Sequence, residues 1–277
     1  MTLVLRRSIW AVTAAICLIA TPARAQYKPQ TVNDLATGES YHVEGGALLW
    51  FPSAELTVAS GGSGALSGLE GTTIDAKRDL GLVDKRLPQL NLVLRPSRPH
   101  KFRLQYIPIK YEQSATLQRN IDFNGQRYRL GIPVNSTLDW KAVRFGYEYD
   151  FITRNRGYGG FIVEAKYTDV RVDLASPVQL EFAHARAPIP ALGGVARVYV
   201  VPNISITGEV TGFKLPDSID KRYAAHYVDV DIYGTINFTN NVGAQVGFRS
   251  LDLGYLIKQD KGSFTLRGLY FGVVARY

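Results

Sequence analysis

Strict alternation of apolar and polar residues recurs along the chain and constrains its fold more than any other feature. It occurs in four stretches, at residues 144–151, 227–238, 241–249 and 268–277. In the first of these, one parity is aromatic throughout, whereas the other carries Arg144, Glu148 and Asp150. Because successive strand residues point to opposite faces, each stretch predicts a strand with one apolar face and one polar face.

Turn residues divide the chain into ten expected strands. These are residues 40–51, 88–96, 101–118, 136–152, 158–173, 194–201, 204–213, 222–238, 242–258 and 264–277. Four connections are short, whereas those at 52–87, 121–135, 175–193, 214–221 and 259–262 are longer. A proline inside a strand removes a ladder donor, so we place a turn at Pro202-Asn203. Without that turn there would be nine strands, with the two termini on opposite sides.

The lengths of these segments favour a membrane barrel over a soluble sandwich. A strand that crosses a bilayer at a tilt needs about 9–11 residues. Aromatic residues stand near segment ends, as in interfacial girdles. They are Tyr41, Phe51, Phe151, Phe238 and Tyr277. The sequence therefore predicts an all-β fold, a ten-stranded antiparallel transmembrane up-and-down barrel, with eight strands as the alternative. A soluble lipocalin-like barrel, apolar inside and polar outside, is the architectural rival.

The first 25 residues have the features of a secretory signal peptide. Arg6 and Arg7 precede an apolar run at residues 9–20, which is too short to span a bilayer as a helix. Small residues follow at Ala23 and Ala25, so cleavage is expected after Ala25. We expect residues 26–39 to form a periplasmic N-terminal segment and residues 40–277 to form the barrel.

Three stretches carry a family resemblance. They are the alternating strand Arg144–Tyr149, the turn Val201–Ser205 and the strand Gly247–Asp252. Together they resemble small Gram-negative outer-membrane β-barrel proteins, the OmpA/OmpW-like group. The ending Phe271-x-Val273-x-Ala275-x-Tyr277 is similar to the C-terminal signal of such barrels. The resemblance implies location in the bacterial outer membrane, with outer-membrane lipid, lipopolysaccharide and the barrel-assembly machinery as partners. Fold analogy does not select an activity.

The polar parity of the strands predicts a lumen with nearly balanced charge. We expect an ion-pair network of Glu44, Arg95, Arg103, Arg144, Glu148, Glu164, Lys166, Arg197, Glu209, Asp229, Asp231, Arg249 and Arg276. Isolated ions in a narrow lumen cost several kcal/mol each, so these groups should pair. Barrels of about eight strands are filled by side chains. We therefore expect a lumen largely closed by ion pairs and by Tyr199, Tyr233 and Tyr270.

No motif indicates catalytic, cofactor-binding or metal-binding residues. The four histidines lack metal-ligand spacing. Ser250 and Asp252 share the outward parity of His226, but a hairpin centred on Asn240 sets His226 opposite Gly254, four residues from Ser250. A lipid-modifying triad is thus disfavoured. A rim protease would need acidic residues and a histidine to converge; Asp169, Asp173, Glu181 and His184 are the candidates.

These observations favour a non-enzymatic integral membrane protein with a structural or surface-interaction role. A narrow, porin-like channel for small or apolar solutes is the first alternative, and an outer-leaflet lipid-modifying enzyme is the second. The formal net charge of +8 is not clustered, which argues against a nucleic-acid partner. The glycine-rich connection 52–87 is the most distinctive insertion, in which residues 73–80 could add a short strand above the rim.

Overall fold

Long strands account for nearly all of the structure that follows the predicted N-terminal segment. The computed structural model describes residues 34–61, 71–123, 125–176, 180–215, 223–257 and 260–277. Residues 1–25, where a signal peptide is predicted, lie outside this part of the chain.

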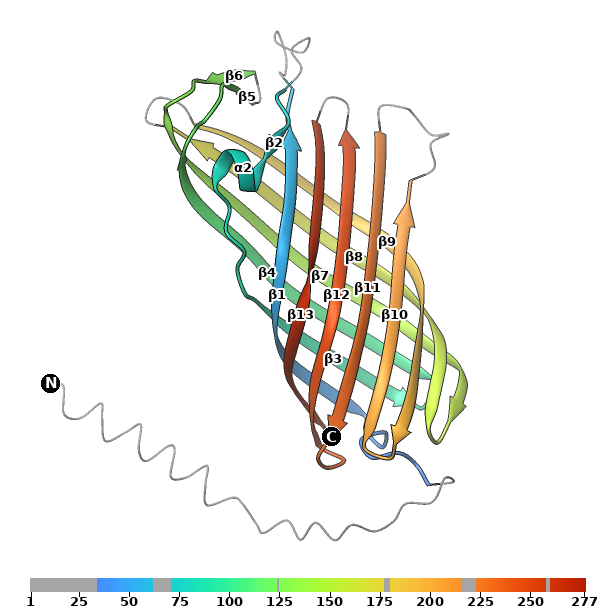
Figure 1. Cartoon of the computed structure of the whole chain (residues 1–277). Coiled ribbons are helices and arrows are strands. Elements are labelled where there is room, and N and C mark those ends of the chain that lie inside the picture. The colour runs from blue at the N-terminus through green and yellow to red at the C-terminus, as the bar shows by residue number, and fades with distance from the viewer. Residues whose placement is uncertain (1–33, 62–70, 124, 177–179, 216–222, 258–259) are drawn as a thin grey trace, which may run out of the picture. The chain divides into compact units, whose positions relative to one another are not determined.

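Ten antiparallel strands close into a barrel (Figure 1). They are β1 (Val43–Ala59), β3 (Leu87–Ser97), β4 (His100–Thr116), β7 (Pro133–Arg154), β8 (Gly157–Ala175), β9 (Leu180–Val201), β10 (Ile204–Lys214), β11 (Tyr223–Asn237), β12 (Val242–Ile257) and β13 (Asp260–Arg276). Each pairs with the next, and β13 pairs with β1 from Glu44 opposite Arg276 to Ala59 opposite Lys261. The predicted ten-stranded up-and-down barrel is confirmed, and the turn at Pro202-Asn203 joins β9 to β10.

The two ends of the barrel differ in their connections. Tight turns at 98–99, 155–156, 202–203 and 238–241 lie at one end, where β1 begins and β13 ends. The opposite end carries β2 (Ile74–Asp75), α2 (Ala76–Leu80) and the hairpin of β5 (Ile121–Phe123) with β6 (Gln126–Tyr128). Short turns face the periplasm in outer-membrane barrels, so the end with the longer connections is extracellular.

The short helix α2 follows β2 within the predicted insertion. The Asp75 carboxylate accepts hydrogen bonds from the backbone N–H groups of Lys77 and Arg78 and so caps the first turn. Gly81 ends the helix in the left-handed conformation, with φ of 66°. Within the described ranges, no helix has both the length and the apolar character required to cross a membrane.

Two strands extend further than the sequence predicted, and in each the extension contains proline. Strand β1 continues through Pro52, and β9 already begins at Leu180, so the predicted loops over 52–87 and 175–193 are too long. Beyond Trp50, β1 no longer pairs with β3. It still pairs with β13 on one side, and β2 pairs with its other side only at Thr57 and Val58. Residues of β9 before Leu192 pair with β8 alone. Proline is tolerated on such one-sided strand segments because no second neighbour needs its missing N–H.

An apolar belt covers the outside of the barrel toward its periplasmic end. On β12 and β13 the side chains of Val246, Phe248 and Phe271 are 55%, 46% and 55% exposed. Nearer the extracellular end, the same outward parity changes to polar residues. Examples are Glu55, Lys110, Asp169, Asp252 and Arg267. A lipid-facing band bounded by a polar rim places the barrel across a membrane, with its upper part projecting above the bilayer.

Candidate functional site

The lumen within the apolar belt is filled by ionised side chains. All thirteen residues predicted to form the ion-pair network point inward, where eleven are buried and Arg103 and Asp231 are half-buried. They come from all ten barrel strands, and most of them meet in three groups. The groups centre on Asp229, on Glu209 with Glu148, and on Glu39 at the periplasmic rim.

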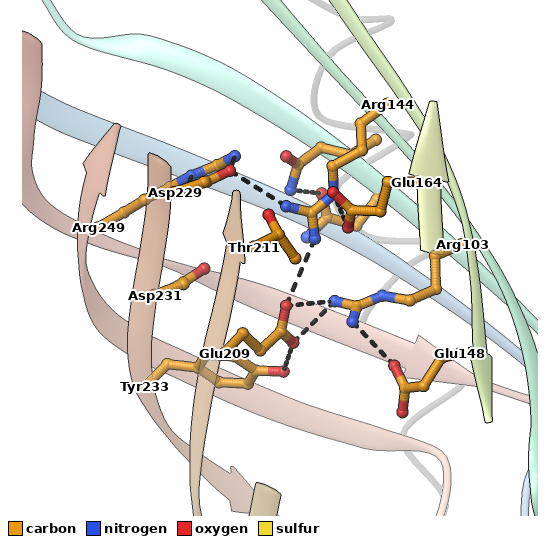
Figure 2. Close-up of polar contacts among 12 residues, drawn as sticks. Arg103, Arg144, Glu148, Glu164, Glu209, Thr211, Asp229, Asp231, Tyr233 and Arg249 are labelled. Atoms are coloured by element: carbon orange, nitrogen blue, oxygen red, sulfur yellow. Dashed lines mark hydrogen bonds and ion pairs between the residues drawn. The ribbon is translucent and has the colours of Figure 1, made fainter. Parts of the chain in front are cut away.

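Asp229 on β11 gathers three cations. Arg249 from β12 binds it through two parallel hydrogen bonds, Nε to Oδ1 at 2.9 Å and Nη2 to Oδ2 at 2.6 Å. Arg144 Nη1 and Lys166 Nζ each lie 3.3 Å from Oδ2 (Figure 2 shows Asp229, Arg249 and Arg144). The paired geometry is the strongest that a guanidinium forms with a carboxylate. Glu164 completes the group, 3.1 Å from Arg144 Nε and 3.2 Å from Lys166 Nζ.

Glu209 on β10 and Glu148 on β7 share one arginine. Arg103 Nη2 donates to both oxygens of Glu209 at 2.7 Å, and Nη1 donates to Glu148 at 2.8 Å. Arg144 Nη2 reaches the same Glu209 at 3.4 Å, and the Tyr233 hydroxyl donates to it at 3.0 Å. The two groups are thus joined through Arg144 into one network.

The periplasmic rim is closed by Glu39, which comes from the segment before β1. Its carboxylate accepts from Arg95 at 3.2 Å, Arg197 at 3.1 Å and the Tyr199 hydroxyl at 2.8 Å. Burial alone would raise the pKa of Glu39, but Arg197 and Arg95 lower it to about 2. Glu39 therefore stays ionised and holds two strands, β3 and β9, to the N-terminal segment.

Two network residues were missed at the sequence level. Lys101 Nζ lies 2.6 Å from Glu148 and 2.8 Å from Asp150, fully inside the barrel. Lys101 has the same parity as Arg103, so the alternation indicated an inward side chain. Its position beside a turn made that indication easy to overlook. Glu39 stands in a non-periodic segment, where no strand pattern could indicate an inward position.

The predicted tyrosines take part in the network, and one predicted girdle residue does not lie on the outside. Tyr199 and Tyr233 bind Glu39 and Glu209, and the Tyr270 hydroxyl donates to Asp231 at 2.9 Å. Tyr41 is 6% exposed, with the guanidinium of Arg95 4.9 Å from its ring centre. Its prediction as an interfacial aromatic is wrong because the chain before β1 folds into the rim.

Above the ionic network the lumen changes to an apolar core. Trp50 and Trp140 are buried there, and Trp140 packs edge-on against Phe264 with ring centres 5.9 Å apart. Further members are Leu48, Leu56, Leu87, Ile107, Ile109, Tyr111, Leu138, Leu251, Leu253 and Leu266. The interior is therefore ionic where the exterior faces lipid and apolar where the exterior faces water.

A small polar cavity of about 50 Å³ lies within the ionic network. Arg103, Glu209 and Asp231 are among its walls. A water molecule needs about 10–15 Å³ measured in this way, so the space suits a few waters. Within the described part of the chain, no three His, Cys, Asp or Glu side chains are placed to hold a metal ion.

His42 and His226 lie outside the network. His226 Nε2 is 3.1 Å from Asp252 Oδ1 on the outer face, and the register pairs His226 with Gly254 and Ser250 with Val230. Ser250 is thus four residues along from His226, as the hairpin register predicted. His42 shares the parity of the inward Glu44 but is exposed at the periplasmic rim, because β1 begins only at Val43.

The candidate protease residues are spread along two strands. Asp169 and Asp173 lie on β8, and Asp173 forms an exposed ion pair with Arg171 at 2.9 Å. His184 belongs to β9, where the register sets it opposite Arg171. The expected connection at 175–193, which would contain Glu181 and His184, is wrong because β9 already begins at Leu180.

Known proteins resemble this chain in fold. The sequence matches no protein-family model and no curated protein. Among solved structures, the outer membrane protease OmpT from Escherichia coli is similar over 89% of this chain and 100% of its own, with a TM-score of 0.53 and 7% identity. Ail, the attachment invasion locus protein of Yersinia pestis, covers 84% of this chain and 99% of its own, with a TM-score of 0.36 and 9% identity.

The fold and the lipid-facing belt together define the class of this protein. It has the fold of the bacterial outer-membrane β-barrels, and its apolar exterior belongs in the outer membrane.

Proposed function

We propose that this protein is a non-enzymatic integral outer-membrane barrel with a closed lumen and a structural or surface-interaction role. The observation that carries the proposal is the reach of the ion pairs across the barrel. Arg103 on β4 binds Glu209 on β10, and Arg144 on β7 lies 3.3 Å from Asp229 on β11. In the ring of ten, the two strands of each pair are four positions apart, so both ion pairs cross the lumen.

The physical size of the barrel supports closure. Water-filled porins have about 16–18 strands, whereas barrels near eight strands are filled by their own side chains. In this lumen, the cations of one wall meet carboxylates of the other, so the paired charges replace the water that an open pore would contain. Opening a path would separate buried ion pairs, which is costly for each uncompensated charge.

Closure is tested by planar-bilayer recording of the purified protein. We expect no steady conductance from the wild type. The double variant Arg103→Ala with Glu209→Ala removes one ion pair across the lumen without changing the net charge, and we expect transient channel openings from it. The matched control is Arg127→Ala with Asp122→Ala, an exposed pair on the β5–β6 hairpin, which should behave as the wild type. Large, stable, ion-selective currents through the wild type would overturn the proposal.

A narrow route for small apolar solutes is the second candidate. The apolar upper half of the lumen favours it, since such a surface could receive a solute from the extracellular side. Radiolabelled-solute uptake into proteoliposomes separates the candidates, because a closed barrel admits no more solute than protein-free vesicles.

We further propose that the barrel has no catalytic activity and that its partners are outer-membrane lipid, lipopolysaccharide and the barrel-assembly machinery. His226 and Asp252 lie on the outer face above the apolar belt, but the register sets Ser250 apart from His226. Unchanged acyl chains of lipid A in mass spectra after overexpression are the expected result. Loss of an acyl chain that depends on His226 would contradict it.

A further inference from the structure

A second cavity lies at the extracellular end, beside α2. Its volume is about 50 Å³, and its walls come from seven separate segments of the chain: β1, residues 74–82, β4, β5, β7, β8 and β13. Leu80 of α2, Tyr111, Leu138, Leu174 and Phe264 are among the lining residues. No described residue that lines this cavity carries a charge. The site is therefore distinct from the ionic network, both in level and in chemistry.

Tyr111 gives this cavity one unsatisfied polar group. Its side chain is only 3% exposed, and its hydroxyl has no hydrogen-bond partner among the described residues. By contrast, Tyr128, which is also buried at this end, donates its hydroxyl to the carbonyl of Leu174 at 3.1 Å. Leaving a buried hydroxyl unpaired costs about 1–3 kcal/mol, so such a group requires an explanation.

The surroundings restrict what could satisfy that hydroxyl. Asp79 and Arg119, the ion pair that fastens α2, are 2.6 Å apart and engage each other. Lys77 and Asp84 form a further pair at 2.9 Å beside the helix. A ligand with a net charge would thus find no free counter-ion among these four groups. The walls are mostly apolar, and besides Tyr111 they carry the neutral polar side chains of Gln113, Ser136 and Thr137. Such walls suit a neutral molecule that is mostly hydrocarbon and carries a single oxygen.

We propose that this cavity binds a short, neutral, oxygen-bearing hydrocarbon, such as an aliphatic alcohol or ketone, whose oxygen accepts a hydrogen bond from Tyr111. The volume corresponds to about four water-sized spheres, which sets the size at roughly four or five heavy atoms or a similar segment of a longer molecule. The binding site lies at the extracellular end, and the proposal does not depend on whether the lumen conducts.

The proposal is tested by ¹⁹F NMR with 4,4,4-trifluoro-1-butanol as the probe and the full-length mature barrel in lipid nanodiscs. A ligand of this size binds weakly, in the millimolar range. We expect a saturable change in the ¹⁹F signal beyond that given by empty nanodiscs, and competition by unlabelled 1-butanol. A change that only rises linearly with probe concentration, as in empty nanodiscs, would overturn the proposal.

Variants distinguish binding in the cavity from partition of the probe into lipid. They also distinguish the contribution of the Tyr111 hydroxyl from that of the cavity walls. Tyr111→Phe should weaken binding about 2- to 10-fold, which is the effect of one hydrogen bond. Leu80→Trp fills the cavity from the α2 side and should abolish binding. Leu138→Phe provides a second cavity-filling variant should the first fail to fold. The matched control Tyr167→Phe alters an outward tyrosine and should bind as the wild type. Equal binding by wild type and filled variants, or an unchanged affinity in Tyr111→Phe, would overturn the assigned site or contact.

Discussion

At the scale of single residues, the proposed closure of the lumen depends on carboxylates that each contact several cations. Asp229 contacts Arg249, Arg144 and Lys166, all within the barrel and all poorly exposed. Removing one charge of such a group leaves the others buried without compensation, and this costs more than the pair itself contributes. The network is therefore sensitive to loss of its acidic members.

Replacement of Asp229 by Asn tests this dependence. We expect Asp229→Asn to lower the free energy of unfolding by about 3–5 kcal/mol, because three cations lose their shared counter-ion. Urea unfolding in lipid vesicles, followed by tryptophan fluorescence, measures the change. The control Asp173→Asn breaks an exposed pair with Arg171 and should cost less than about 1 kcal/mol. Equal effects of the two substitutions would show that the network does not stabilise the barrel.

Glu39 should make the stability of the periplasmic rim depend on pH. Its pKa falls from an ordinary value of 4.5 to about 2 in the folded protein, despite burial, because Arg197 and Arg95 stabilise the carboxylate. Since the folded pKa is the lower one, the stabilisation is present above about pH 4.5 and is lost as the pH falls towards 2.

Comparison of the wild type with Glu39→Gln isolates this contribution. We expect a stability difference on the order of 3 kcal/mol at pH 6 that shrinks steadily between pH 4.5 and pH 2. Thermal unfolding by circular dichroism over this range measures it. A difference that is constant with pH would contradict the linkage. Glu55→Gln, on the outer face above the belt, provides the matched control.

At the same scale, the sequence supplied the inward positions wherever the alternation was regular. Parity placed Arg103, Glu209 and Asp229 in the lumen because strand geometry fixes which face each residue occupies. It could not give the partners, since Arg103 and Glu209 belong to strands that are brought together only by barrel closure. The inward position of Glu39 depends on a tertiary contact of a segment with no period.

At the scale of elements, the number and order of the strands were predictable, whereas their extracellular ends were not. Turn residues mark each periplasmic end, and there the predicted limits agree closely with the strands. At the other end, Pro52 and Pro188 appeared to exclude strand structure. Both lie where the strand has one long neighbour, and whether a neighbour is present cannot be read from local sequence.

The seam between β1 and β13 depends on glycine. A Cβ added to Gly272 would lie 2.2 Å from the Ala47 carbonyl oxygen and 2.6 Å from the Leu48 Cα, both of the facing strand. These contacts are with backbone, so relief requires β1 and β13 to move apart. The same addition at Gly208 meets nothing within 4 Å.

Gly272→Ala should therefore impair closure, whereas Gly208→Ala should not. We expect the first substitution to destabilise the barrel by about 1–3 kcal/mol, the usual cost of overpacking. The fraction of heat-modifiable, compact protein on semi-native gels and the urea midpoint both report closure. If Gly272→Ala folds as completely as Gly208→Ala, the seam tolerates a side chain and the argument fails.

At the scale of the whole molecule, the barrel combines two arrangements of the same alternation. Around the membrane, outward residues such as Phe248 are apolar and inward ones such as Arg249 are ionic. Above the membrane, outward Asp252 is polar and inward Leu253 is apolar. Each strand keeps its two faces, but their chemistry is exchanged at the level where the solvent outside changes from hydrocarbon to water.

This exchange predicts that the loss of stability caused by an outward charge depends on its position along the barrel axis. Two positions on the neighbouring strands β12 and β13 test it. Val246→Arg places a cation on the lipid-facing belt, where arginine costs about 2–4 kcal/mol near the bilayer midplane. Ser263→Arg places the same cation on the outward face of β13 above the belt, where it stays in water. We expect Val246→Arg to lower the free energy of unfolding measured in vesicles. Ser263→Arg should leave it unchanged within error. Equal tolerance of both would mean that the outer face near Val246 is not in contact with hydrocarbon, and the exterior assigned to lipid would then have to face water.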